Sequence, residues 1–305
     1  MATETITQLV QPATIPLQTS RASKGRDVAT TLNYYRNPGD GSPPTPVYVG
    51  GNTVTNERPT APTKVIIHDM TGEEKKYSLD SYGFEIVKHE SKEKDFDDEE
   101  RLKRDYYPDC ENLYKAVTGA SEAHLFGHLV RRGPTHWHSL GAGNAAKKGP
   151  LHRVHIDQSY SGAELILRKN LPSQADAILG SGRRWQIINL WRPIRTIYKD
   201  PLAVAAAHSI PEGDLIEAKV IYTKQPPPLN ENRTWTILPN EKHEWYYKNE
   251  QKSDEVLLIK CFDSKVEEGL ARRAPHCAFK DPEREGNEFA DRESVEIRAV
   301  LVYDK

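Results

Sequence analysis

Two side chains that can bind a metal ion stand two positions apart, His155 and Asp157. In a β-strand, alternate side chains project from the same face, so both can reach one ion. A third ligand is available in His276, far along the chain at the edge of a later β-type segment. Two histidines and one carboxylate on one face of Fe(II) leave coordination positions open for a bidentate ligand and O₂. The sequence therefore predicts a mononuclear iron site of His155, Asp157 and His276.

An arginine and a serine follow the last of these residues. Arg292 stands sixteen residues after His276, and Ser294 shares its face of the predicted strand. This pair resembles the motif with which 2-oxoglutarate-dependent oxygenases bind their cosubstrate. A guanidinium can hold the distal carboxylate through two charge-assisted hydrogen bonds, which a lysine cannot reproduce. Arg298 shares the same face and is a second candidate for this role, or a partner of Glu296; we rank Arg292 first.

Four further residues are candidates for contact with a substrate. Asn189 and Arg192 lie in a segment rich in aromatic and basic residues, and His128 and Arg131 stand at the end of another predicted strand. Arg131 can pair with a carboxylate on a substrate. Packing within the strand explains the first segment equally well, and solvation at a strand end also explains His128 and Arg131.

The segment 132–150, rich in Gly, Ala and Lys, is predicted to form a lid over the site. It contains His136 and His138, which we expect to be exposed and not to be ligands. Cys277 is predicted to be a small packing residue, because no cysteine hydrolase arrangement surrounds it.

Short β-type segments, bounded by turn residues, recur along the chain. They cover 123–130, 154–156, 184–191, 215–222, 234–238, 245–248, 256–262 and 295–303. This spacing predicts a mainly β protein with flanking helices, built as a cupin-like jelly roll or a barrel.

The rest of the chain predicts a simple domain organisation. Residues 1–60, with many Thr, Pro, Gly and Asn, are expected to form an extended N-terminal arm, and 61–305 a single domain with helical insertions. Residues 65–79 are predicted to form a β-hairpin. The charged stretch from residue 91 predicts helical segments that end at Gly119.

Composition narrows the classes of partner and compartment. The 42 basic and 44 acidic residues leave no excess positive charge for a phosphate backbone, so we expect no nucleic-acid partner. No apolar run has the length of a membrane span, and no leader-like segment begins the chain. Three cysteines without CxxC spacing argue against a disulfide framework. We therefore expect a cytoplasmic protein; a homodimer is possible.

From residue 31 to 303 the chain resembles fungal oxygenases grouped with the gibberellin desaturases, the aspergillic acid hydroxylase/desaturase and the cephem 7α-methoxylase component. The resemblance rests on separate motifs in one order, at 32–35, 89–92, 154–159, 185–193, 260–264, 275–276 and 292–294. It implies a double-stranded β-helix, Fe(II), 2-oxoglutarate and O₂ as cofactor and cosubstrates, and oxidation of a small-molecule secondary metabolite by hydroxylation or desaturation. The interval from His276 to Arg292 is longer than in the best-known oxygenases, and a loop at 281–291 can absorb the difference.

Two other functions remain open at the level of sequence. A cupin-like dioxygenase, isomerase or lyase can use the same metal ligands without 2-oxoglutarate. A binding module without catalysis can use the same fold, with His155 and Asp157 as polar core residues.

Overall fold

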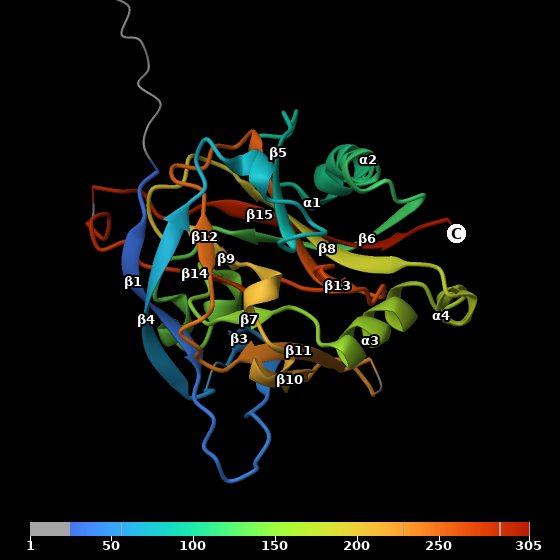
Figure 1. Cartoon of the computed structure of the whole chain (residues 1–305), viewed down its shortest axis with the longest axis horizontal. Coiled ribbons are helices and arrows are strands. Elements are labelled where there is room, and N and C mark those ends of the chain that lie inside the picture. Colours follow the sequence, from blue (N-terminus) through green and yellow to red (C-terminus); the bar gives the residue numbers. More distant parts are fainter. Residues whose placement is uncertain (1–24, 56, 228, 287, 305) are drawn as a thin grey trace, which may run out of the picture.

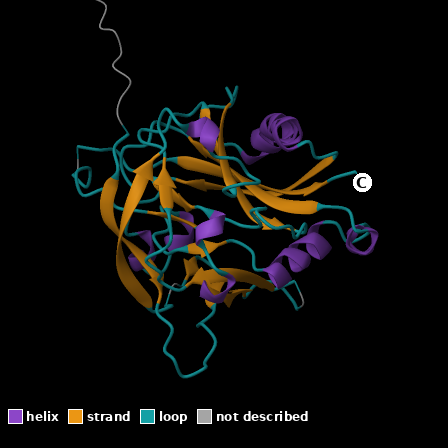
Figure 2. Ribbon diagram, viewed as in Figure 1, coloured by secondary structure: helices purple, strands orange, loops and turns teal. Residues whose placement is uncertain are grey.

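The computed structural model describes residues 25–55, 57–227, 229–286 and 288–304. In this part of the chain the strands form two sheets that face each other (Figures 1 and 2). Their inner faces are apolar and form one core, in which Ile187 and Val300 of one sheet pack near Ile156 and Ile237 of the other. The arrangement is the jelly roll that the recurring strands predict.

The larger sheet carries the metal-ligand candidates on neighbouring strands in its middle. In spatial order its strands are β1 (Val28–Tyr35), β4 (Thr60–Asp69), β12 (Trp245–Tyr247), β9 (Leu202–Ala205), β14 (His276–Ala278), β7 (His155–Ile156), β11 (Glu231–Ile237), β10 (Leu215–Tyr222), β2 (Val47–Gly50) and β3 (Thr53–Val54).

The smaller sheet is antiparallel and carries the arginine candidates. Its order is β5 (Phe84–Lys88), β13 (Glu255–Asp263), β8 (Trp185–Pro193), β15 (Ser294–Val302) and β6 (Glu122–Arg131). Side chains alternate along β15: Val295 and Ile297 pack outward in the cluster that includes helix α2, whereas Val300 points to the inner core. Ser294, Glu296 and Arg298 share the inward alternation.

Helices flank the sheets. They are α1 (Glu99–Arg101), a π-helical turn (Leu102–Tyr106), α2 (Tyr107–Thr118), α3 (Tyr160–Asn170) and α4 (Ala175–Ser181). α2 lies on the outer face of the smaller sheet (Figure 1). It ends at Gly119, whose φ of 73° is the left-handed conformation that favours glycine, as predicted. None of the described helices is long and apolar enough to span a membrane.

Most predicted strands are present, and two expectations differ. Residues 65–68 lie in β4, but residues 74–76 form a 3₁₀ turn and the following residues no strand, so the predicted hairpin is wrong. The segment predicted as an N-terminal arm supplies β1, β2 and β3, and β1 pairs with β4 along its whole length. Its apolar alternation is interrupted by Thr and Asn, which hid the strand; residues 1–24 lie outside the described part.

Candidate active site

The fold brings the three predicted metal ligands together. His155, Asp157 and His276 each offer a ligand atom, and these atoms all lie within 4.8 Å of one another. The two imidazole centroids are 4.5 Å apart. No other such cluster of His, Cys, Asp and Glu side chains occurs in the described residues.

Strand pairing explains why residues so distant in sequence meet. His276 of β14 is directly opposite His155 of β7, and β14 also pairs with β9 through His276 and Val204. On its other side β7 pairs with β11, where Thr236 is opposite His155. Both histidines are therefore fixed by backbone ladders, and Asp157 follows the end of the short strand β7 on the same alternation.

The hydrogen bonds of both imidazoles determine which nitrogen is free. Nδ1 of His155 lies 2.8 Å from the carbonyl oxygen of Arg153, and Nδ1 of His276 lies 3.4 Å from that of Ala274. A carbonyl oxygen only accepts, so each Nδ1 carries the proton and donates it. Each Nε2 is then left with a lone pair for a metal ion, the arrangement in which a second partner orients a ligating histidine.

The charge states also suit a metal ion. Burial, followed by repulsion from His155, lowers the pKa of His276 to about 4, so its ring is neutral near pH 7. Burial alone would raise the pKa of Asp157, but the charge of Arg298 holds it well below its usual range. Two imidazoles and a carboxylate are the donor set of a facial triad for Fe(II).

Asp157 is held by two residues of the opposite sheet. One carboxylate oxygen, Oδ2, accepts a hydrogen bond of 2.9 Å from the Asn189 amide and lies 3.1 Å from a guanidinium nitrogen of Arg298. Its other oxygen, Oδ1, lies 3.3 Å from Nε2 of His155. Asn189 was predicted to line the pocket, and the structure places it beside the predicted ligand Asp157; its own carbonyl oxygen, Oδ1, is buried without a hydrogen-bond partner among the described residues.

Arg298 is neutralised by the protein itself. Besides Asp157, its guanidinium contacts the carboxylate of Glu296 at 2.7 Å. Sequence reasoning placed Arg298 on the correct face and named Glu296 as a partner, but it missed the contact with Asp157. The alternation along β15 indicated which face Arg298 is on. It did not indicate that the two sheets bring Arg298 close to Asp157.

Arg292 is in the opposite situation. Its side chain is 4% exposed, it lies over the Trp191 ring at 5.5 Å, and it donates to the carbonyl oxygen of Asp200 at 2.9 Å. Its Nε has no hydrogen-bond partner, and Arg292 forms no ion pair with any described residue. Burial, followed by the charge of Arg131, lowers its pKa to about 9. Ser294, two residues on, is also buried.

Two residues predicted to contact the substrate lie on the outer face of the smaller sheet, away from the three metal-ligand candidates. Arg192 is fully buried on the outer face of the smaller sheet, where it donates to the Tyr106 hydroxyl and to the carbonyl oxygens of His89 and Ser253, each at 2.7 Å. His128 contacts the hydroxyl of Tyr107 in α2 at 2.8 Å. Asn189 and Arg192 are three positions apart, so a strand directs them to opposite faces.

The remaining candidates fall in other places. Arg131 is opposite Ser294 in the strand register, on the inward face, and donates to the carbonyl oxygen of Gly149 at 2.8 Å. His136 is exposed, as predicted, whereas His138 is partly buried against Trp137, and burial lowers its pKa to about 4. Cys277 is buried in the inner core.

Comparison with known proteins agrees with this geometry. A family model described as an oxidoreductase/YMDC permease-like domain matches residues 32–302. The chain is 38% identical to the hydroxylase/desaturase efuI of Hormonema carpetanum, over 91% of this chain and 95% of that protein. It is 37% identical to the alpha-ketoglutarate-dependent dioxygenase phiK of a fungal species, over 74% and 80%.

A solved structure shows the same fold. The iron and alpha-ketoglutarate-dependent endoperoxidase NvfI superposes with a TM-score of 0.77 at 23% identity, covering 93% of this chain and 100% of that one. The extent of the match to efuI and its relatives decides between the alternatives left open by the sequence. The chain belongs to the fungal family of Fe(II)/2-oxoglutarate-dependent hydroxylases and desaturases.

Proposed function

We propose that the protein oxidises a small-molecule secondary metabolite at an iron centre held by His155, Asp157 and His276. The observation that carries the proposal is the convergence of these three side chains, with both Nδ1–H groups directed to backbone carbonyls, which leaves both Nε2 atoms to bind a metal ion. With Fe(II), 2-oxoglutarate and O₂ bound, such a centre supplies the oxidant that removes hydrogen from a substrate while 2-oxoglutarate is converted to succinate.

Arg292 is the proposed anchor for the distal carboxylate of 2-oxoglutarate, and Ser294 adds a hydrogen bond. A buried guanidinium without a protein carboxylate is costly unless an anion is supplied from outside. Arg292 has a free Nε and no ion pair within the described residues, which supports this role. Arg298 is a weaker candidate because Asp157 and Glu296 already neutralise it.

The surrounding side chains prepare the centre. Asn189 and Arg298 hold the Asp157 carboxylate in place and keep it ionised, so that it is available as a ligand without reorganisation. The core of the two facing sheets keeps bulk water away from the reacting groups.

Arg131 is the proposed contact for an acidic group of the substrate. It is on the inward face beside Ser294, and the only side-chain hydrogen bond that it makes within the described residues goes to the Gly149 carbonyl. Replacing Arg131 by Met is expected to raise KM for the substrate while 2-oxoglutarate affinity is kept. A loss of 2-oxoglutarate affinity would assign Arg131 to the cosubstrate instead.

Two finer predictions accompany this function. A homodimer is tested by light scattering coupled to size-exclusion chromatography. A cytoplasmic location is tested by imaging a fluorescent fusion in the source cells.

Succinate formation tests the proposed function. The purified protein with Fe(II), ascorbate, 2-oxoglutarate and O₂ should release succinate. A metabolite that is a substrate should accelerate succinate release, and its product should have gained one oxygen atom or lost two hydrogen atoms. His155→Ala should abolish both effects. Succinate release by His155→Ala at the wild-type rate would contradict the assignment of the centre.

A further inference from the structure

The second histidine of the proposed centre stands at the very start of strand β14, where a stretch of irregular backbone ends. His276 directly follows the β13–β14 connection, residues 264–275, which has no helix or strand. Its last part, 271–275, is largely buried. A buried irregular segment lacks the repeated hydrogen bonds of a strand, so specific contacts must fix its position.

Lys260 supplies such a contact from β13. Its side chain is 0% exposed, and its Nζ donates to three acceptors: Asp80 Oδ1 at 2.8 Å, Asp263 Oδ2 at 2.8 Å and the carbonyl oxygen of Ala271 at 2.9 Å. A lysine ammonium has three N–H donors, and here each has a partner. The third acceptor belongs to the connection, five residues before His276.

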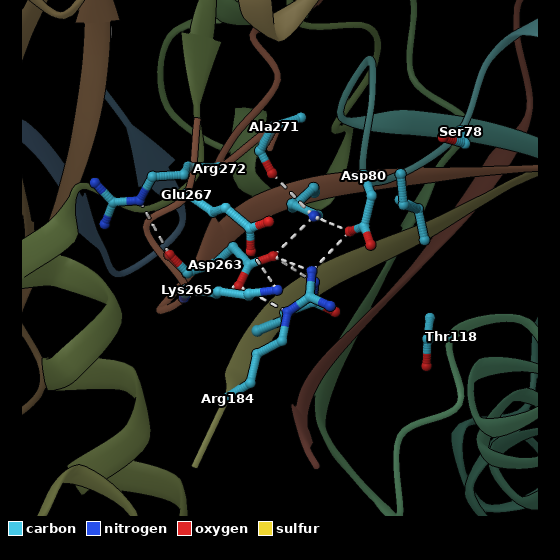
Figure 3. A network of polar contacts seen from close by, with 12 residues as sticks. Ser78, Asp80, Thr118, Arg184, Asp263, Lys265, Glu267, Ala271 and Arg272 are labelled. Carbon is cyan, nitrogen blue, oxygen red and sulfur yellow. Dashed lines mark hydrogen bonds and ion pairs between the residues drawn. The ribbon is translucent and has the colours of Figure 1, made fainter. Parts of the chain in front are cut away.

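The network around Lys260 is electrically balanced. Arg184 contacts both Asp263 and Asp80 through one guanidinium nitrogen, at 2.6 and 2.7 Å. Figure 3 shows Asp80, Arg184 and Asp263 converging, with Ala271 of the connection above them and Arg272 to their left. Two cations and two carboxylates compensate each other's burial, so removal of one partner leaves charge uncompensated.

Backbone hydrogen bonds also hold the β13–β14 connection in place. The amide of Ala274 donates to the carbonyl oxygen of Lys260, and the amide of Ala271 donates to that of Asp80, at 2.8 and 2.7 Å. Gly83 packs directly beneath, with a φ of 87°; a Cβ there would lie 3.0 Å from that of Ala274. The connection is therefore pressed between β13 and the segment 80–83.

We propose that Lys260 is a positioning residue that fixes the β13–β14 connection and thereby places His276 for metal binding. This inference rests on the proposed iron centre, since His276 must be a ligand for its position to matter. Lys260 itself contacts neither the ligand atoms nor the cosubstrate candidates.

The test is a titration with Co(II), whose visible absorption reports ligation without turnover. Lys260→Met removes the ammonium at similar volume and is expected to weaken Co(II) binding by about 10-fold or more, the range for partners that orient metal ligands. Lys248→Met is the matched control, because Lys248 is a buried lysine that pairs with Glu74 and Glu255, outside the connection. It should keep the wild-type affinity.

Hydrogen exchange provides a second readout. In Lys260→Met the amides of residues 271–274 should exchange faster than in the wild type, and in Lys248→Met they should not. Asp80→Ala, which removes a half-exposed acceptor and leaves Lys260 in place, should give the same changes to a smaller degree if Lys260→Met does not fold. Wild-type Co(II) affinity and wild-type exchange in every folded variant of Lys260 and Asp80 would overturn the inference. Failure of the wild type to bind Co(II) would instead remove the proposed metal centre, and exchange alone would then test the fixation by Lys260.

Discussion

A guanidinium nitrogen of Arg298 on β15 lies 3.1 Å from Oδ2 of Asp157, which links this proposed metal ligand, just after the end of β7, to the facing sheet. The contact holds the carboxylate in one orientation and keeps its pKa well below the usual range despite burial. The position of the Asp157 carboxylate therefore depends on the distance between the two sheets.

Arg298→Met is expected to weaken Co(II) or Fe(II) binding by about 10- to 100-fold, because the carboxylate loses the charge that orients it. Equilibrium metal titration measures this. Arg168→Met, which removes an exposed ion pair with Asp176, serves as the control and should be neutral. Equal affinities of the Arg298 variant and the wild type would show that Asp157 is placed without Arg298.

Arg292→Met is expected to lower 2-oxoglutarate affinity by roughly 10- to 100-fold, from the loss of a charged hydrogen bond worth about 1.5–3 kcal/mol. Ser294→Ala should cost only a few-fold, because one neutral donor is lost. Calorimetric titration of 2-oxoglutarate into the Mn(II)-loaded protein gives both values. Unchanged affinity in Arg292→Met, with a loss in Arg298→Met, would transfer the cosubstrate role to Arg298.

Arg192→Met is expected to reduce the free energy of unfolding by roughly 3 kcal/mol or more, because a fully buried charge with several hydrogen bonds is removed. Urea unfolding measures the loss. Metal and 2-oxoglutarate affinities should be unchanged, since Arg192 faces α2. A selective loss of ligand binding without destabilisation would contradict this placement.

Asp263→Asn is expected to make the free energy of unfolding less dependent on pH in the acid range. Burial alone would raise the pKa of Asp263, but Arg184 and then Lys260 hold it below its ordinary value of 3.8. A carboxyl with a depressed folded-state pKa stabilises the fold above its unfolded pKa, and this contribution is lost as pH falls through the folded-state pKa. Urea unfolding at pH values from neutral down to about 3 should therefore show the gap between wild type and variant closing below about pH 5. A gap independent of pH would exclude the ionised Asp263 as its source. Asp176→Asn, at an exposed position, is the control.

The sequence predicted those features that depend on short-range alternation. The spacing of His155 and Asp157 placed two ligand candidates on one face, and the alternation along β15 grouped Ser294, Glu296 and Arg298. Alternation did not predict the direction of the Arg192 side chain. Its strand is buried on both faces, so no polar face distinguishes the inside of the sheet from the outside.

Contacts between the sheets could not be predicted at all. The meeting of Arg298 with Asp157 and the burial of Lys260 beneath residue 271 depend on tertiary approach, which a single sequence does not encode locally. Strand β1 was not predicted because Thr30 interrupts the apolar residues of its inward face and because the surrounding segment is rich in turn formers.

Anaerobic titration with Fe(II) and 2-oxoglutarate, in wild type and in His155→Ala, tests the iron centre most directly. Chelation of 2-oxoglutarate by iron at a site of His155, Asp157 and His276 should give a weak visible charge-transfer band in the wild type, and the band should vanish in the variant. A band of equal strength in His155→Ala, or none in a wild type that holds iron, would contradict the account.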